Sequence, residues 1–244
     1  MSNITNTRKE EFNGSQKVYA SCKTPEGLAS FPHLNQPDEY MGKRQYKVDL
    51  RLNPSDPETA TFIEEVKAWE EKAKGTQRAN LQLQIDGCKG ARDADKKSKL
   101  EAMLADVDGA KYKSLLSTEY DRDSGDPTGN LTLRAKMNAE GGSGADKYTM
   151  EPKLYTATGK VSLAEAPVIT AGSTLRLNLE ISTYEMPSSG YVGISVRLKD
   201  VLIVKIGSAG GGAGDNPFGG DNAFTPDTFS SAPSTPENID EEGY

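Results

Sequence analysis

The chain has 244 residues, of which 35% are hydrophobic, and a formal net charge of −7 at pH 7. No stretch approaches the roughly 20 consecutive apolar residues that a membrane-spanning helix needs, and the first ten residues lack the apolar segment of a signal peptide, so neither a membrane protein nor a secreted one is expected. Cys22 and Cys88 have no metal-binding spacing and are expected to stay reduced in an intracellular protein.

The negative charge is concentrated at the C-terminal end. Residues 207–244 contain seven acidic residues and no Lys or Arg, so residues 1–206 carry 29 bases and 29 acids. Gly and Pro supply 12 of these last 38 residues, and no apolar periodicity remains. Such a composition predicts a flexible acidic tail, which ends in the aromatic Tyr244. A nucleic-acid-binding body that is neutral overall must gather its bases on one face.

The N-terminal part predicts a short arm followed by two strands. Residues 1–15 are polar and are expected to be disordered, and the domain proper is expected to span residues 16–206. Residues 16–23 are typical of a first strand. In residues 44–52, apolar and polar side chains alternate, which predicts a strand with one buried face.

A helix is predicted after the second strand. Asp56 can cap its N-terminus and Pro57 suits its first position, while Gly75 is the expected end. Apolar residues follow at spacings of three and four: Phe62, Ile63, Val66, Trp69 and Ala73. Trp69 is therefore expected in the core and not as a platform for base stacking.

Residues 76–129 are interpreted as an insertion between strands. It contains a short amphipathic helix over residues 96–107, whereas residues 81–85 fit either a strand or a helix. The carboxylates of Asp121, Asp123 and Asp126 lie in a turn-rich segment, for which a solvated loop is favoured over a metal site.

Four strands are predicted in the C-terminal half, over residues 131–137, 153–158, 174–184 and 191–206. The last changes phase near Lys199 and Asp200, which predicts a β-bulge. Together these elements predict a mainly β fold: an OB-like antiparallel Greek-key barrel with one long helix, a helix-containing insertion and a disordered acidic tail.

Catalytic signatures are missing from the sequence. His33 is the one histidine and is expected to have a structural or surface role, and neither Gly-Lys pair is followed by the Ser or Thr of a Walker loop. No catalytic residue, metal ligand or cofactor is therefore predicted, and binding chemistry remains.

Cations along phosphates and aromatic faces for bases are what binding of single-stranded DNA requires. The predicted strands offer both on their solvent faces. The candidate residues within or beside strands are Lys43, Arg44, Lys47, Arg51, Arg134, Lys136, Tyr184, Arg197 and Lys199.

Two motifs carry a resemblance to a known family. The segment YKVDL at residues 46–50, followed by an Asp-Pro helix start, resembles the replication single-stranded DNA-binding proteins of short-tailed coliphages. So do APVITAGSTLRL at residues 166–177 and GISVRLKDVLIV at residues 193–204. The order of elements matches over about residues 16–206, and the acidic tail ending in an aromatic matches as well.

The resemblance implies an OB barrel that binds single strands without sequence preference, in DNA replication, recombination and repair in the cytoplasm of an infected bacterium. It places phosphate-binding residues near Lys43 or Arg44 and near Arg134 and Lys136, and a stacking aromatic at Tyr184. A second aromatic expected two residues later is replaced by Met186.

The resemblance also implies roles for the tail. It is expected to recruit the replicative DNA polymerase and the helicase-primase, to shield the DNA site and to support a homodimer. The tail residues expected to interact are Asp240, Glu241, Glu242 and Tyr244. Two alternatives stay open at this point: a phage structural or assembly protein with a β-barrel core, and a metal-dependent nuclease that uses the Asp121 group.

Overall fold

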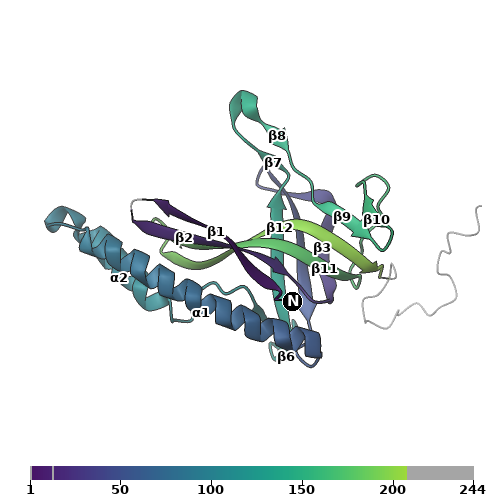
Figure 1. Cartoon of the computed structure of the whole chain (residues 1–244), viewed down its shortest axis with the longest axis horizontal. Coiled ribbons are helices and arrows are strands. Elements are labelled where there is room, and N and C mark those ends of the chain that lie inside the picture. The colour runs from purple at the N-terminus through teal and green to yellow at the C-terminus, as the bar shows by residue number, and fades with distance from the viewer. Residues whose placement is uncertain (1, 13, 208–244) are drawn as a thin grey trace, which may run out of the picture. The chain divides into compact units, whose positions relative to one another are not determined.

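The central feature of the computed structural model, which describes residues 2–12 and 14–207, is a closed barrel of five strands (Figure 1). Around the barrel the hydrogen-bonded order is β11–β3–β4–β6–β12, and pairing of β11 with β12 closes it. These strands are β3 (Gly27–Tyr40), β4 (Lys43–Leu52), β6 (Pro127–Asn138), β11 (Thr174–Met186) and β12 (Tyr191–Lys205). The mainly β, OB-like barrel predicted from the sequence is confirmed.

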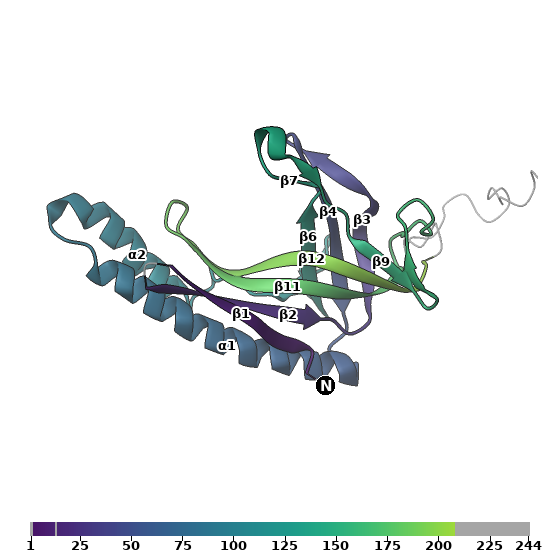
Figure 2. The ribbon, with the colours of Figure 1, turned by 45° about the horizontal axis from the view of Figure 1, so that its top comes forward.

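Shorter strands extend this barrel. Strands β1 and β2 form a hairpin on the edge of β11, and β9 and β10 form another beside β12. The small β7–β8 ribbon projects from the barrel in both views (Figures 1 and 2). Their bounds are β1 (Ile4–Phe12), β2 (Ser15–Lys23), β5 (Ser117–Tyr120), β7 (Glu140–Gly141), β8 (Tyr148–Thr149), β9 (Lys153–Thr156) and β10 (Gly159–Val161).

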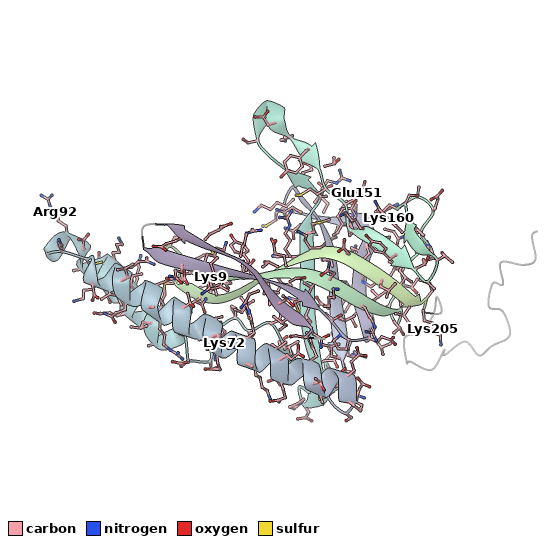
Figure 3. The ribbon with its side chains drawn as sticks, in the orientation of Figure 1. Lys9, Lys72, Arg92, Glu151, Lys160 and Lys205 are labelled. Carbon is pink, nitrogen blue, oxygen red and sulfur yellow. The ribbon has the colours of Figure 1, made fainter. Side chains whose placement is uncertain are left out.

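Two helices pack outside the barrel. Helix α1 (Pro57–Asp86) lies along the β1–β2 hairpin, and α2 (Ala94–Asp106) folds back against the second half of α1 (Figure 2). Arg92, in a 3-10 turn between them, marks the tip of this helical hairpin, which extends beyond the strands (Figure 3). A further 3-10 turn spans Gly144–Asp146.

The main core fills the barrel and the space under α1. Val48 and Leu50 of β4 face Leu133 and Ala135 of β6, and all four are fully buried. Trp69 lies in the same cluster with 7% of its surface exposed, and its Nε1 donates to Oδ1 of Asn6 at 3.0 Å. The prediction that Trp69 is a core residue is therefore confirmed.

The change of phase predicted for the last strand is a β-bulge. Asn178 of β11 pairs with Asp200, but the next residue, Leu179, pairs with Leu198, so Lys199 is the extra residue. A bulge of this kind bends a long strand and increases its twist, which lets β12 follow the barrel wall.

The predicted end of the first helix at Gly75 is wrong, because α1 continues to Asp86. Gly75 faces open space, where a glycine costs only its helix propensity of about 1 kcal/mol. Beyond it, Gln77, Asn80 and Leu81 are buried against the barrel and α2. These tertiary contacts outweigh the local signal of the glycine.

The predicted disorder of residues 1–15 is also wrong for most of the arm. Residues 4–12 form β1, paired antiparallel with β2 from Ile4↔Cys22 to Phe12↔Ser15. Because β1 is an edge strand with mostly polar residues, it lacks the apolar alternation that indicates a half-buried strand. Its backbone hydrogen bonds to β2 hold it in the sheet.

Candidate nucleic-acid interface

A groove on the outside of the barrel brings several of the candidate residues together. It has a volume of about 540 Å³ and lies between β6, the first half of β12 and the segment that precedes β5. β6 and β12 pair only at Lys136↔Arg197, so the two strands diverge from that point. Lys113 enters the gap and pairs with β12, its N–H donating to the carbonyl of Val192 at 3.1 Å.

Cations line the groove from three elements. Lys17 comes from β2, Lys113 from the segment before β5, and Arg134 and Lys136 from β6. Arg197 of β12 lines an adjacent depression that also includes Lys136. Within residues 2–12 and 14–207, only Arg134 among these five forms an ion pair. The other four charges are therefore available for an anion.

Strand pairing places three cations in a row. Lys47 of β4 lies directly opposite Lys136, which in turn lies opposite Arg197. Like charges at directly opposed positions destabilise a sheet by a few tenths of a kcal/mol, and only Lys47 is partly compensated, by Asp38 at 2.5 Å. A chain of phosphates laid across the three strands would relieve this repulsion.

Arg134 is held by a carboxylate in the free protein. Its guanidinium makes two hydrogen bonds of 2.9 Å each to Asp49, and these raise its pKa further. The side chain is nevertheless 76% exposed. Asp49 therefore orients Arg134 along the groove and competes with any phosphate for it.

The remaining predicted cations lie further from the groove. Arg51 and Lys199 are paired with carboxylates, at 2.6 Å from Glu119 and 3.9 Å from Glu180, respectively. Arg44 lies 3.7 Å from Glu140 near the β3–β4 turn, and Lys43 begins β4 beside it. These four share the outer surface of the barrel, but none lines the groove.

Tyr184 is the aromatic side chain of the groove. It lies on β11, half-buried, and burial raises the pKa of its hydroxyl. Gln77 of α1 holds the backbone of Tyr184 in place. Its Nε2 donates to the carbonyl of Tyr184 at 3.1 Å and to the carbonyl of Gly193, the strand partner of Tyr184, at 2.9 Å. Met186, in place of a second aromatic, lines the same groove.

Tyr19, another tyrosine within a strand, is already covered. Arg8 stacks on its ring at 3.9 Å from the centroid, and its hydroxyl donates to Glu10 at 2.8 Å. Only 9% of Tyr19 is exposed. A base could reach this ring only by displacing Arg8.

Sequence reasoning missed Lys113 and Ser114 because they lie in an irregular segment without periodicity. It also missed Phe31, which the structure places on the same face in β3. The tail residues Asp240, Glu241, Glu242 and Tyr244 lie outside the described residues.

The acidic group near Asp121 is used for local structure. Oδ1 of Asp121 accepts the N–H groups of Asp123 and Ser124 at 3.0 and 2.8 Å, and these bonds lower its pKa. No group of three His, Cys, Asp or Glu side chains in the described part of the chain is arranged to hold a metal ion. Neither helix described has the length and apolar character needed to cross a membrane.

In sequence and in fold the chain is similar to the single-stranded DNA-binding proteins of bacteriophages, as the sequence motifs indicated. The sequence is 27% identical over 213 residues to the single-stranded DNA-binding protein of enterobacteria phage T3, covering 82% of this chain and 81% of the relative. No protein-family model matches the sequence.

Two solved structures also align with the chain. The crystal structure of gp2.5, a single-stranded DNA-binding protein encoded by bacteriophage T7, aligns with a TM-score of 0.55 at 15% identity, covering 80% of this chain and 97% of that one. This likeness supports the fold. The single-stranded DNA-binding protein of bacteriophage Enc34 in complex with ssDNA aligns with a TM-score of 0.47 at 14% identity, covering 78% of this chain and 91% of that one.

Proposed function

We propose that this protein binds single-stranded DNA without sequence preference, in phage DNA replication and recombination. The observation that carries the proposal is the row Lys47–Lys136–Arg197, which runs across three strands into a groove that also holds Tyr184. A row of like charges is favourable only beside a polyanion, and an aromatic next to it suits a base whose partner strand is absent.

Each part of the groove has a distinct role in this proposal. Lys113, Lys136 and Arg197 neutralise successive phosphates, and their contacts carry no sequence information because every nucleotide has the same backbone. Tyr184 stacks on one base, which is equally tolerant of sequence because every base has a π-face. The double hydrogen bond from Gln77 keeps the backbone of Tyr184 in place.

The proposal extends to the C-terminal segment through its charge. Residues 207–244 carry seven acids and no bases, on the same chain as a groove lined by cations. We expect Asp240, Glu241 and Glu242 to compete with phosphates for the groove, with Tyr244 in the position of a base. DNA would then release the segment to recruit a replicative polymerase and a helicase-primase in the cytoplasm of the infected bacterium. A homodimer is part of the same proposal.

Fluorescence anisotropy of a labelled thymidine oligonucleotide, with unlabelled duplex as competitor, tests the proposal. Reversing Arg134 and Lys136 to Glu should weaken binding by roughly tenfold or more, because two cations that line the groove become anions that repel the phosphates. The matched control reverses Lys72 and Lys160, two exposed lysines on α1 and β10 that do not line the groove (Figure 3). Equal affinity of the two double variants for the oligonucleotide would show that DNA binds outside the groove.

The base-stacking role of Tyr184 is tested separately. Tyr184→Ala should cost about 1–3 kcal/mol of binding free energy, the usual contribution of one base–aromatic stack, whereas Tyr184→Phe should retain most of it. If Tyr184→Ala lowers the melting temperature but leaves affinity unchanged, the residue only packs on the rim of the barrel. A wild-type protein that binds no single strand at low salt would favour a structural or assembly role.

A further inference from the structure

Phe31 has an unusual backbone for an aromatic residue. Its φ angle is +48°, in the left-handed region that side chains other than glycine, Asn and Asp rarely adopt. It lies in an irregularity of β3, where Ser30 pairs with Asp49 but the next paired residue, His33, pairs with Lys47. An extra residue therefore bulges from the strand at Phe31-Pro32, and such a bulge can redirect a side chain.

The ring of Phe31 is also exposed to solvent. The residue is 76% accessible, although it is embedded in a barrel strand. A strained backbone and an apolar ring in water each cost free energy. β3 remains paired with β4 on both sides of the bulge, so the barrel wall continues past Phe31 while its ring lies in solvent.

Phe31 lies beside the residues of the proposed DNA face. With Lys47, Asp49, Arg134 and Lys136 it lines a hollow of about 390 Å³ on the outer face of β4 and β6. Arg134 and Lys136 also line the groove that contains Tyr184, so the two depressions share one wall.

The charges of this hollow are largely compensated. Asp49 pairs with Arg134 at 2.9 Å, and Asp38 pairs with Lys47 at 2.5 Å, so only Lys136 retains an uncompensated charge among the described residues that line it. A nearly neutral hollow next to an exposed ring suits a nucleobase better than a phosphate.

We propose that Phe31 is a second base-stacking residue, so that a bound single strand crosses β6 and β4 from Tyr184 to Phe31. The inference rests on the proposed function, and it adds a base-binding subsite on β3 that is separate from the groove. The phosphates between the two stacked bases pass over the row of cations that includes Lys136, while the bulge presents the ring of Phe31 to the base.

Phe31→Trp provides a direct probe of stacking. The native Trp69 is 7% exposed and bonded to Asn6, so its emission serves as a constant background measured on the wild-type protein. Titration of Phe31→Trp with a thymidine oligonucleotide should quench the introduced indole, in parallel with the anisotropy of the labelled oligonucleotide. Wild-type emission should change little.

Phe31→Asn removes the ring while retaining a residue that tolerates positive φ, so folding should be preserved. Its affinity for single strands should fall by about five- to a hundredfold, as expected for the loss of one stacked base. The matched control is Met41→Asn, because Met41 also has positive φ, at +50°, and is 83% exposed, but lies outside both depressions. Met41→Asn should bind as the wild type does.

The outcomes separate this inference from the proposed function. If the wild type binds single strands but the introduced indole of Phe31→Trp is not quenched and Phe31→Asn binds equally well, the subsite on β3 is refuted and the proposed function stands. If the wild type binds no single strand, both are refuted. If the emission of Phe31→Trp shifts with protein concentration in the absence of DNA, the side chain at this position contacts a second copy of the chain and the stacking role is refuted.

Discussion

Gln77 and Tyr184 are joined by a hydrogen bond of 3.1 Å, from the side-chain amide of the helix residue to the backbone carbonyl of the strand residue. The same amide nitrogen reaches the carbonyl of Gly193 at 2.9 Å, and its oxygen accepts the hydroxyl of Tyr112 at 3.0 Å. One buried side chain thus links α1, the β11–β12 hairpin and the segment that leads into the groove.

Gln77→Met should therefore affect both stability and binding. It keeps the approximate volume but leaves buried carbonyls without a donor, which should lower the free energy of unfolding by about 1–3 kcal/mol. DNA affinity should fall as well, because the backbone of Tyr184 is no longer fixed. Urea unfolding and oligonucleotide titration measure the two effects. Tyr112→Phe, which removes only the hydroxyl, is the milder comparison, and equal effects of both variants would contradict this role of Gln77.

Asp49 should restrain DNA binding through Arg134. Asp49→Asn removes a carboxylate that holds the guanidinium, so affinity for single strands at low salt should rise by roughly two- to tenfold, since one charge interaction at a few ångströms in water contributes on the order of 1 kcal/mol. Arg134→Ala should lose less affinity in the wild-type background than in Asp49→Asn, because in the wild type the attraction of Arg134 for a phosphate is partly offset by its pairing with Asp49. Additive effects in this double-mutant cycle would show that the two residues act independently.

Burial of Glu185 predicts a specific pH dependence. Its pKa is raised by burial, although Asn80 donates to it at 3.2 Å. As pH rises, the Glu185 carboxyl group therefore ionises at a lower pH in the unfolded chain than in the folded protein. The free energy of unfolding falls from about pH 4.5 up to the raised pKa. Glu185→Gln should remove this loss. The difference in free energy of unfolding between the variant and the wild type, measured with urea, should be near zero at acid pH and should favour the variant most at neutral pH. A constant difference between the two proteins at all pH values would contradict the assignment.

The acidic C-terminal segment should compete with DNA. Deleting residues 208–244 should raise affinity for single strands, more at low salt than at high salt, because competition between like charges for one groove is screened by ions. A full-length variant with Asp240→Asn, Glu241→Gln and Glu242→Gln separates charge from chain length. If neither variant differs from the wild type across a salt series, the segment does not compete for the groove. Capture of replication proteins by the wild-type segment alone tests recruitment.

Much of the barrel could be predicted from sequence because its strands are buried on one face. The alternation in β4, β6 and β11 matches their burial, and the change of phase in β12 marks the bulge at Lys199. β3 could not be found in this way, since Pro32, Pro37 and the bulge at Phe31 interrupt any period of two. Its strand pairing comes from its neighbours and not from its own pattern.

The candidate site could be predicted only in part for a related reason. Alternation indicates that Lys47, Arg134 and Lys136 face solvent, but the register that places Lys47 opposite Lys136 depends on the fold. Lys113 reaches the groove from an irregular segment, through a bridge to Gly193. Phe31 has an apolar side chain that sequence patterns assign to a core, and only its positive φ angle and its exposure in the fold show that it points outward.

The salt dependence of binding tests the central claim most directly. For single strands, the logarithm of the binding constant falls with the logarithm of salt concentration by about 0.7 for each phosphate neutralised. Replacing Lys113 and Lys136 by Gln removes two of the proposed phosphate contacts and should make this slope shallower by roughly 1.4. The same change at Lys72 and Lys160 should leave the slope as in the wild type. An unchanged slope for Lys113→Gln/Lys136→Gln would contradict the assignment of the groove as the path of the DNA backbone.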